Sequence, residues 1–145
     1  MGIEFIVSAC LAGLNCRHDG ANCELSDIKT LVSEGRALPI CPEQLGGLPT
    51  PRSICEIVGG DGRDVLEGIA KVFSQDGMDM TELFIKGAQQ TLYLAQLIGA
   101  RGALLKQKSP SCGCGQIFRR KLLVAGYGVT AALLKKNGIQ VEPMG

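Results

Sequence analysis

The sequence predicts one α/β domain over residues 1–145, with three layers and a mostly parallel sheet of the Rossmann-like or flavodoxin-like kind. Three short apolar runs have the composition of strands that are buried on both faces, at residues 3–7, 37–40 and 103–105. Two longer segments have the spacing of amphipathic helices, at residues 25–33 and 81–98. Strands that alternate with helices in this way form a mostly parallel sheet.

The first half of the chain contains a strand, a helix and a second strand. The strand at 3–7 leads into Ser8-Ala9-Cys10 and a polar loop, and the helix at 25–33 follows. The strand at 37–40 then ends at Cys41-Pro42-Glu43. Because two strands joined through a helix run parallel, we expect both to end at the same edge of the sheet.

The middle of the chain is less regular. Two prolines and two glycines exclude a regular strand at residues 46–51. Residues 59–62 are a glycine-rich turn and a candidate for disorder, and residues 65–73 are ambiguous between a strand and a short helix. Asp79 and Thr81 are both suitable caps for the long helix that follows.

The last third of the chain contains a cysteine-bearing loop between regular elements. The strand at 103–105 leads directly into this loop, which contains Ser-Pro-Ser-Cys-Gly-Cys-Gly. Gly128-Val129-Thr130 opens a last helix that runs to Lys136. A turn at Asn137-Gly138 then leads to a final strand at 139–141.

Composition excludes several classes of partner. The formal net charge is +1 and the chain has no Trp, so nothing favours binding to nucleic acid or to a membrane surface. No apolar run reaches the roughly 18 residues of a membrane span, and no charged segment precedes the first run, so we expect a cytoplasmic protein.

In such a protein, seven cysteines indicate metal or redox chemistry rather than a disulfide framework. The sequence does not determine the oligomeric state.

Three cysteines come at the ends of predicted strands or in the loop that follows, and they are Cys10, Cys41 and Cys112. Neighbouring parallel strands are about 4.8 Å apart and end at one edge, where open α/β sheets bind ligands. Three thiolates there could hold zinc, with Cys16, His18 or Cys114 as fourth ligand, or an iron–sulfur cluster with one iron open. Cysteine is also a common core residue, but Cys-Pro-Glu and Ser-Pro-Ser-Cys-Gly are poor core sequences. The residues alone do not separate zinc from iron.

Polar residues near these cysteines are candidates for catalysis or substrate binding. Glu43 is placed to act as a general acid or base, and the alternative is a solvated loop carboxylate. Ser109 and Ser111 either donate hydrogen bonds within the site or shape the turn around Pro110. Cations that could hold a polar substrate, or that are simply surface charge, are Lys106, Lys108 and Arg52.

Five motifs follow one another in order over nearly the whole chain. They are S-A-C-L-A-G-L-N-C-R-H-D-G (8–20), P-I-C-P-E-Q-L-G-G-L-P-T-P-R (39–52), G-M-D-M-T (77–81), L-K-Q-K-S-P-S-C-G (105–113) and G-Y-G-V-T-A-A-L-L (126–134). Together they resemble the thiouracil desulfidase family, whose bacterial and archaeal members were long described only as a domain of unknown function.

The resemblance implies a 4Fe–4S cluster held by Cys10, Cys41 and Cys112, with one iron that has no protein ligand. It also implies an acid/base role for Glu43 and a substrate-side role for Ser109. Residues 116–121 lack an Asp-Gly piece that the family usually has. We expect this region to shape the pocket.

Two functions from different classes follow from these observations. The first is redox-neutral, hydrolytic desulfuration of a small thiolated heterocycle of the 2-thiouracil type, with the open iron binding the departing sulfur. In that case Ser111, Lys106 and Arg52 are the expected substrate contacts. The second is a non-catalytic metal- or sulfide-binding module that uses the same cysteines for zinc or for a cluster.

Overall fold

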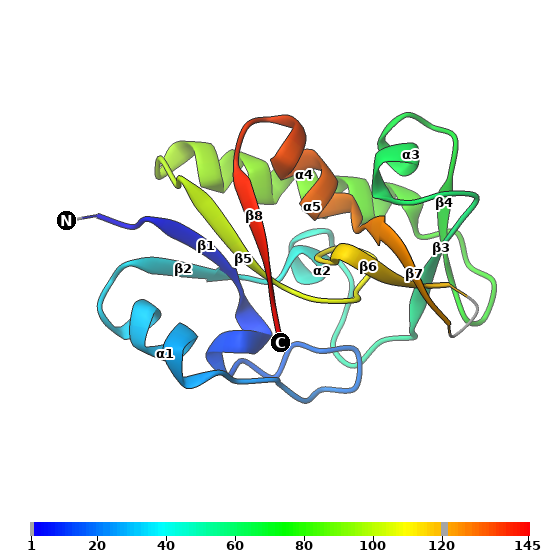
Figure 1. The fold of residues 1–145 in the computed structure, drawn as a ribbon. Helices are drawn as coiled ribbons and strands as arrows, with labels where there is room; N and C mark the ends of the chain where they lie inside the picture. The colour runs from blue at the N-terminus through cyan, green and yellow to red at the C-terminus, as the bar shows by residue number, and fades with distance from the viewer. Residues whose placement is uncertain (1, 120–121) are drawn as a thin grey trace.

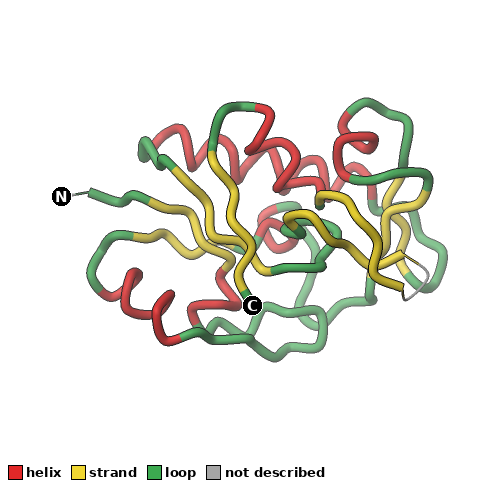
Figure 2. The backbone as a smooth tube through the Cα atoms, viewed as in Figure 1, coloured by secondary structure: helices red, strands yellow, loops and turns green. Residues whose placement is uncertain are grey.

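The computed structural model describes residues 2–119 and 122–145 of the chain. At its centre lies a four-stranded parallel sheet in the order β2-β1-β5-β8 (Figures 1 and 2). The strands predicted at 3–7, 37–40, 103–105 and 139–141 are all confirmed, with small shifts at their ends. Their bounds are β1 (Phe5–Ser8), β2 (Ala37–Ile40), β5 (Gly102–Lys106) and β8 (Gln140–Met144).

Helices cover both faces of this sheet, which confirms the three layers. The predicted helices α1 (Ser26–Ser33) on one face, and α4 (Thr81–Leu97) and α5 (Val129–Lys136) on the other, are visible in Figure 1. Successive side chains of a strand point to opposite faces. Ile6 therefore packs in a cluster of buried side chains from α4 and α5, whereas Val7 packs in a cluster with α1. Burial explains why β1, β2 and β5 have mostly apolar sequences, whereas the edge strand β8 (QVEPM) is largely exposed and carries Gln140 and Glu142.

Two antiparallel hairpins, which the sequence did not predict, lie beside the sheet (Figure 1). They pair β3 (Cys55–Val58) with β4 (Lys71–Ser74), and β6 (Cys114–Arg119) with β7 (Leu122–Tyr127). The hairpins pack against α3 (Gly62–Leu66) and the first half of α4 in a second core. The ambiguous segment 65–73 is thus divided between the end of α3 and β4.

A short helix follows each of the strands β1 and β2. The 3-10 helix η1 (Ala9–Ala12) begins directly after β1 and ends at Gly13, whose φ of 100° favours glycine. The helix α2 (Pro42–Leu45) begins one residue after β2, with proline in its first turn, where a missing N–H leaves no hydrogen bond unmade. These helices carry Cys10 and Glu43.

Two glycines allow α2 to pack directly against the backbone of α4. A Cβ on Gly46 would overlap the carbonyl oxygen of Leu83, and a Cβ on Gly87 would overlap the carbonyl oxygen of Pro42. Because the neighbouring atoms belong to the backbone, they cannot swing aside as a flexible side chain would. The distance between the two helices therefore depends on glycine at both positions.

The chain turns at residues 59–62, as predicted, but the expectation of disorder there is wrong. Asp61 is 6% exposed and caps α3 by accepting the N–H of Arg63 at 3.0 Å. It also accepts the N–H of Tyr127 at 3.1 Å, which connects α3 to β7. Burial raises the pKa of the Asp61 carboxyl, but the N–H donors and the Arg63 guanidinium together lower it below its ordinary value.

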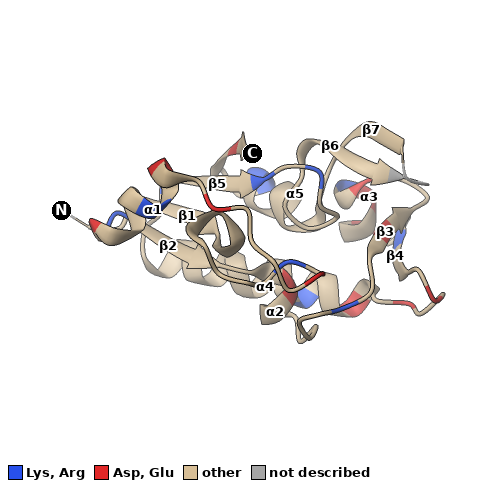
Figure 3. Cartoon of the chain, turned by 90° about the horizontal axis from the view of Figure 1, so that it is seen from below, with Lys and Arg blue, Asp and Glu red and all other residues tan. Residues whose placement is uncertain are grey.

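Charged residues are distributed over the chain rather than concentrated in one element. Figure 3 shows Lys and Arg interspersed with Asp and Glu, in keeping with the net charge of +1. Within residues 2–119 and 122–145, none of the helices has both the length and the apolar character of a membrane span.

We predict that Gly87→Ala destabilises the protein by about 1–3 kcal/mol, because the added methyl overlaps the Pro42 carbonyl. At a helix position with free space around it, the same change would stabilise the protein by roughly 0.5–1 kcal/mol, so a loss of stability would indicate the contact with the Pro42 carbonyl. Urea unfolding measures the change in the free energy of unfolding. Gln89→Ala, at an exposed position two residues along α4, is the control and should change stability by less than about 0.5 kcal/mol. A stabilised Gly87→Ala variant would contradict the close packing.

We predict that Asp61→Ala lowers the free energy of unfolding at pH 7 by about 1–3 kcal/mol, since the N–H groups of Arg63 and Tyr127 lose their partly buried acceptor. The folded-state pKa of Asp61 is lowered, so its contribution is complete above the unfolded value of about 3.9 and is lost as the pH falls through the folded value. The difference between wild type and variant should therefore shrink in acid. Glu67→Ala, at an exposed position after α3, is the control and should change stability at pH 7 by less than about 0.5 kcal/mol.

Candidate active site

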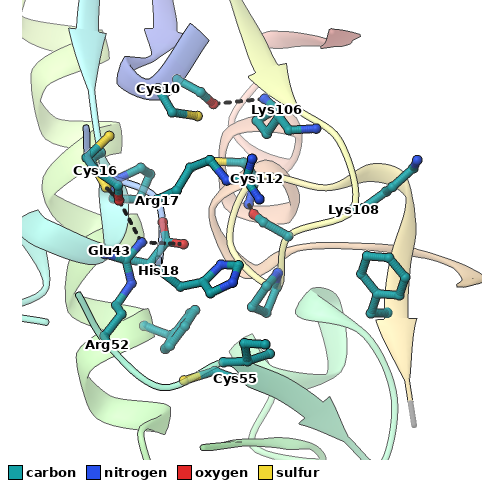
Figure 4. Close-up of a pocket in the computed structure, with 18 of the residues that line it drawn as sticks. Cys10, Cys16, Arg17, His18, Glu43, Arg52, Cys55, Lys106, Lys108 and Cys112 are labelled. Carbon is teal, nitrogen blue, oxygen red and sulfur yellow. Dashed lines mark hydrogen bonds and ion pairs between the residues drawn. The ribbon is translucent and has the colours of Figure 1, made fainter. Parts of the chain in front are cut away.

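A cavity of about 530 Å³ lies at the carboxyl ends of three adjacent strands. Residues 8–10 reach it from the end of β1, residues 40–43 from the end of β2, and residues 106–110 with Cys112 from the end of β5. This is the edge at which open α/β sheets bind ligands. Figure 4 shows most of the residues that line it.

The opposite wall of the cavity has a different character. It is formed by residues 52–56 before and within β3, by Phe84 of α4 and by Phe118 of β6. Cys10, Cys41 and Cys112 lie on the sheet side, whereas this wall combines the rings of Phe84 and Phe118 with Ile54, with the thiol of Cys55 and with the polar side chains of residues 52, 53 and 56. A planar molecule can rest against the two rings while one end reaches the three cysteines of the sheet side.

The three cysteines predicted as ligands all line this one cavity. Cys10 lies in η1, Cys41 lies between β2 and α2, and Cys112 lies in the loop after β5. All three are free thiols. The central position of β1 in the strand order explains their proximity, because β1 pairs with both β2 and β5.

The loop that contains Cys112 is held by the first turn of α5. The N–H groups of Gly128, Val129 and Thr130 donate to carbonyl oxygens of residues 110–113 at 2.8 to 2.9 Å. A Cβ on Gly128 would overlap the backbone of Ser111, so this approach requires glycine. The helix N–H groups that lack an intrahelical partner are thus used to fix the loop.

Glu43 is held at both carboxylate oxygens. Ser111 Oγ donates to Glu43 Oε1 at 2.9 Å, and Arg52 Nη2 lies 3.5 Å from Glu43 Oε2. The side chains of Arg52 and Glu43 are only 8% and 14% exposed. Screening by water and salt is weak at such burial, so this ion pair is stronger than a surface pair.

Comparison with known proteins agrees with these features. A family model described as 2-thiouracil desulfurase matches residues 5–143. The chain belongs to the 2-thiouracil desulfurase family. It is 47% identical over 139 residues to the uncharacterized protein YbbK of Bacillus subtilis (strain 168), with 94% of this chain and 92% of that protein covered. Its fold matches a solved structure of the 4Fe–4S-dependent thiouracil desulfidase TudS at a TM-score of 0.86 and 42% identity, covering 97% of this chain and 90% of that chain.

The thiols of this desulfurase-family chain differ in how readily they ionise. A hydrogen bond with Cys16 lowers the pKa of the Cys10 thiol to about 7, although burial and Glu43 raise it. Cys16 also lowers the pKa of Cys41. Burial, with the nearby Glu43 carboxylate, raises the pKa of Cys112. Thiolates are the metal-binding form of cysteine, and even a thiol of high pKa releases its proton on coordination.

The donor set fits an iron–sulfur cluster. Each of three irons takes one thiolate, so the ligands of a cluster need not converge on one point. Three free thiols on the wall of one cavity meet this requirement. Among the side chains of residues 2–119 and 122–145, no three His, Cys, Asp or Glu form a group that could hold a single metal ion.

The other predicted site residues occupy different positions around the cavity. Lys106 lines it, and its Nζ donates to the carbonyl oxygen of Gly145 at 2.9 Å. Ser109 also lines it, and its Oγ accepts the N–H of Cys112 at 2.7 Å. Ser111 is 1% exposed and lies behind Glu43, in contact with its carboxylate. The structure thus brings all these side chains together, with Ser111 outside the lining.

Sequence reasoning missed several residues of the cavity. Ser8 Oγ accepts the N–H of Lys106 at 2.9 Å and hydrogen-bonds the Cys112 thiol, so it connects β1 to two parts of the site. Its position just before Ala-Cys at a strand end was the available signal. Phe118 lies within the segment 116–121 that we expected to shape the pocket, and it lines the cavity. Residues 120–121 of that segment lie outside the described residues.

We predict that in the cluster-free, reduced chain Cys10 reacts with iodoacetamide at pH 7 faster than Cys55 and Cys114. All three are 8% exposed, but the pKa of Cys55 and that of Cys114 are each raised to about 11, chiefly by burial. The larger thiolate fraction of Cys10, offset by its lower intrinsic nucleophilicity, gives a rate advantage of about a hundredfold. Peptide mass spectrometry measures the rates, which should become equal in urea. Equal rates in the folded chain would contradict the lowered pKa of Cys10.

Proposed function

We propose that the chain is a 4Fe–4S-dependent desulfidase that removes sulfur from a small thiolated heterocycle of the 2-thiouracil type. Membership of the 2-thiouracil desulfurase family supports this function, as does the close fold match to the 4Fe–4S-dependent thiouracil desulfidase TudS. The observation that carries the proposal is the single cavity that contains Cys10, Cys41, Cys112 and Glu43.

The overall reaction is hydrolytic and redox-neutral. A thiocarbonyl compound and water give the corresponding carbonyl compound and hydrogen sulfide, so no electron donor or acceptor is required. When bound by Cys10, Cys41 and Cys112, the cluster supplies an iron that has no protein ligand and that acts as a Lewis acid toward the substrate sulfur.

Glu43 is the proton-transfer group in this proposal. Its carboxylate lines the cavity and is held between Ser111 and Arg52, so it has a defined direction. It takes a proton from the water that attacks the thiocarbonyl carbon, and it returns a proton to the ring nitrogen or to the departing sulfur. General acid–base catalysis of this kind contributes about 10²–10⁴ to a rate.

Ser109 and Lys106 are the proposed substrate contacts. Both line the cavity; Lys106 is the last residue of β5, and Ser109 lies in the loop that follows it. The Ser109 hydroxyl accepts the N–H of Cys112, so its own proton remains available to a ring oxygen or nitrogen. The Phe84 and Phe118 side chains provide the surface on which the ring lies.

Seven free cysteines support the expectation of a reducing, cytoplasmic environment.

We predict that replacing any of the three ligand cysteines by alanine abolishes cluster loading, whereas Glu43→Gln retains the cluster and loses turnover by about 10²-fold or more. After anaerobic reconstitution, iron, acid-labile sulfide and visible absorbance report the cluster, and sulfide release from 2-thiouracil reports turnover. Cys114→Ala is the control, because Cys114 is as buried as Cys10 but does not line the cavity.

Two results would exclude this function. A colourless protein with stoichiometric zinc would support the alternative of a structural metal module, and a brown protein that releases no sulfide would support a non-catalytic sulfide carrier. Full activity of Glu43→Gln would remove Glu43 from the mechanism.

A further inference from the structure

The Arg52 guanidinium is bound on several sides by the protein itself. Nη1 donates to the carbonyl oxygen of Pro49 at 3.3 Å and to Thr50 Oγ1 at 3.1 Å. Nη2 donates to the carbonyl oxygen of Cys16 at 3.0 Å and lies 3.5 Å from Glu43 Oε2. The two terminal nitrogens therefore have four acceptors within the chain, and the side chain is 8% exposed.

These contacts connect three segments that are separate in the sequence. The Cys16 carbonyl belongs to the loop after η1, Glu43 belongs to α2, and Arg52 precedes β3. The backbone N–H of Arg52 also donates to the carbonyl oxygen of His18 at 2.9 Å, so residues 16–18 are held by two hydrogen bonds from one residue. The close-up in Figure 4 shows the dashed contacts from Arg52 to Cys16 and to Glu43.

We propose that Arg52 is a positioning residue that fixes the Glu43 carboxylate and the wall at residues 16–18, rather than a substrate contact. This inference rests on the proposed function, since Glu43 is the group whose direction matters. It replaces the expectation from the sequence, in which Arg52 held the substrate. A guanidinium whose two terminal nitrogens already have acceptors has few donors left to offer a ligand.

The planar shape of the guanidinium explains why arginine is required. Its fixed fork of donors can serve the Cys16 carbonyl, the Glu43 carboxylate and the 49–50 turn at the same time. Lysine would retain a positive charge near Glu43 but would present one compact ammonium group. Together, Arg52 and Ser111 contact different oxygens of Glu43, and two such contacts set the plane of the carboxylate.

The two roles predict different kinetics. Misalignment of a proton-transfer group lowers kcat and leaves substrate binding nearly unchanged, whereas loss of a substrate contact raises KM. For Arg52→Lys we expect kcat for 2-thiouracil to fall about 10–100-fold, with KM changed by less than about threefold. Arg52→Met should show a larger loss in kcat of the same kind.

Hydrogen exchange of the full chain provides a readout that does not depend on turnover. We expect the amides of residues 14–21 to exchange faster in Arg52→Lys than in wild type, both before and after cluster reconstitution. Arg101→Met is the control, because Arg101 is also ion-paired but is 68% exposed and pairs with Glu4, away from the cavity. It should change neither kcat nor exchange at residues 14–21.

The outcomes separate this inference from the proposed function. Faster exchange at residues 14–21 with a lower kcat and an unchanged KM supports the positioning role. A KM raised tenfold or more, with unchanged kcat and exchange, would show that Arg52 binds substrate. If wild type itself releases no sulfide, the proposed desulfidase activity fails, and unchanged exchange in Arg52→Lys would then overturn the positioning role as well.

Discussion

The two contacts on the Glu43 carboxylate hold together the segments from which the site is built. Ser111 reaches Oε1 from the loop after β5, 68 residues along the chain, and Arg52 reaches Oε2 from the segment before β3. Both contacts are largely shielded from water. Removal of Arg52 would leave the buried Glu43 carboxylate without its counter-charge, which is far more costly than loss of a surface pair. The catalytic candidate is therefore also a structural junction.

Close backbone packing makes this junction possible. Gly46 and Gly87 let α2 approach α4, which sets the position of Cys41 and Glu43, and Gly128 lets α5 approach the loop that carries Ser111. Hydrogen bonds between the first turn of α5 and that loop then fix its carbonyl groups. The rigidity of the site comes from helices that contact loops without intervening side chains. Glycine at these positions serves close approach rather than flexibility.

Much of the fold could be predicted from the sequence because its signals are local. Apolar runs and helical spacing gave the four strands of the parallel sheet and its three flanking helices. The rule that parallel strands end at one edge predicted that Cys10, Cys41 and Cys112 would share a site, and one cavity contains all three. The hairpins β3–β4 and β6–β7 were not predicted. In the first hairpin, α3 lies between the two strands. The pairing of β3 with β4 therefore depends on the second core rather than on a turn motif.

The sequence by itself determined the strand–helix order, the edge at which the cysteines gather and, through its motifs, the family. Only the tertiary structure decided which side chains face one another. Ser111 and Ser109 are two residues apart in one loop, yet one contacts Glu43 and the other contacts the Cys112 N–H. Arg52 has the charge of a substrate contact, but its donors are used by Cys16, Thr50 and Glu43. Residue type and spacing define what a side chain can do, whereas its partners depend on contacts between segments that are distant in the chain.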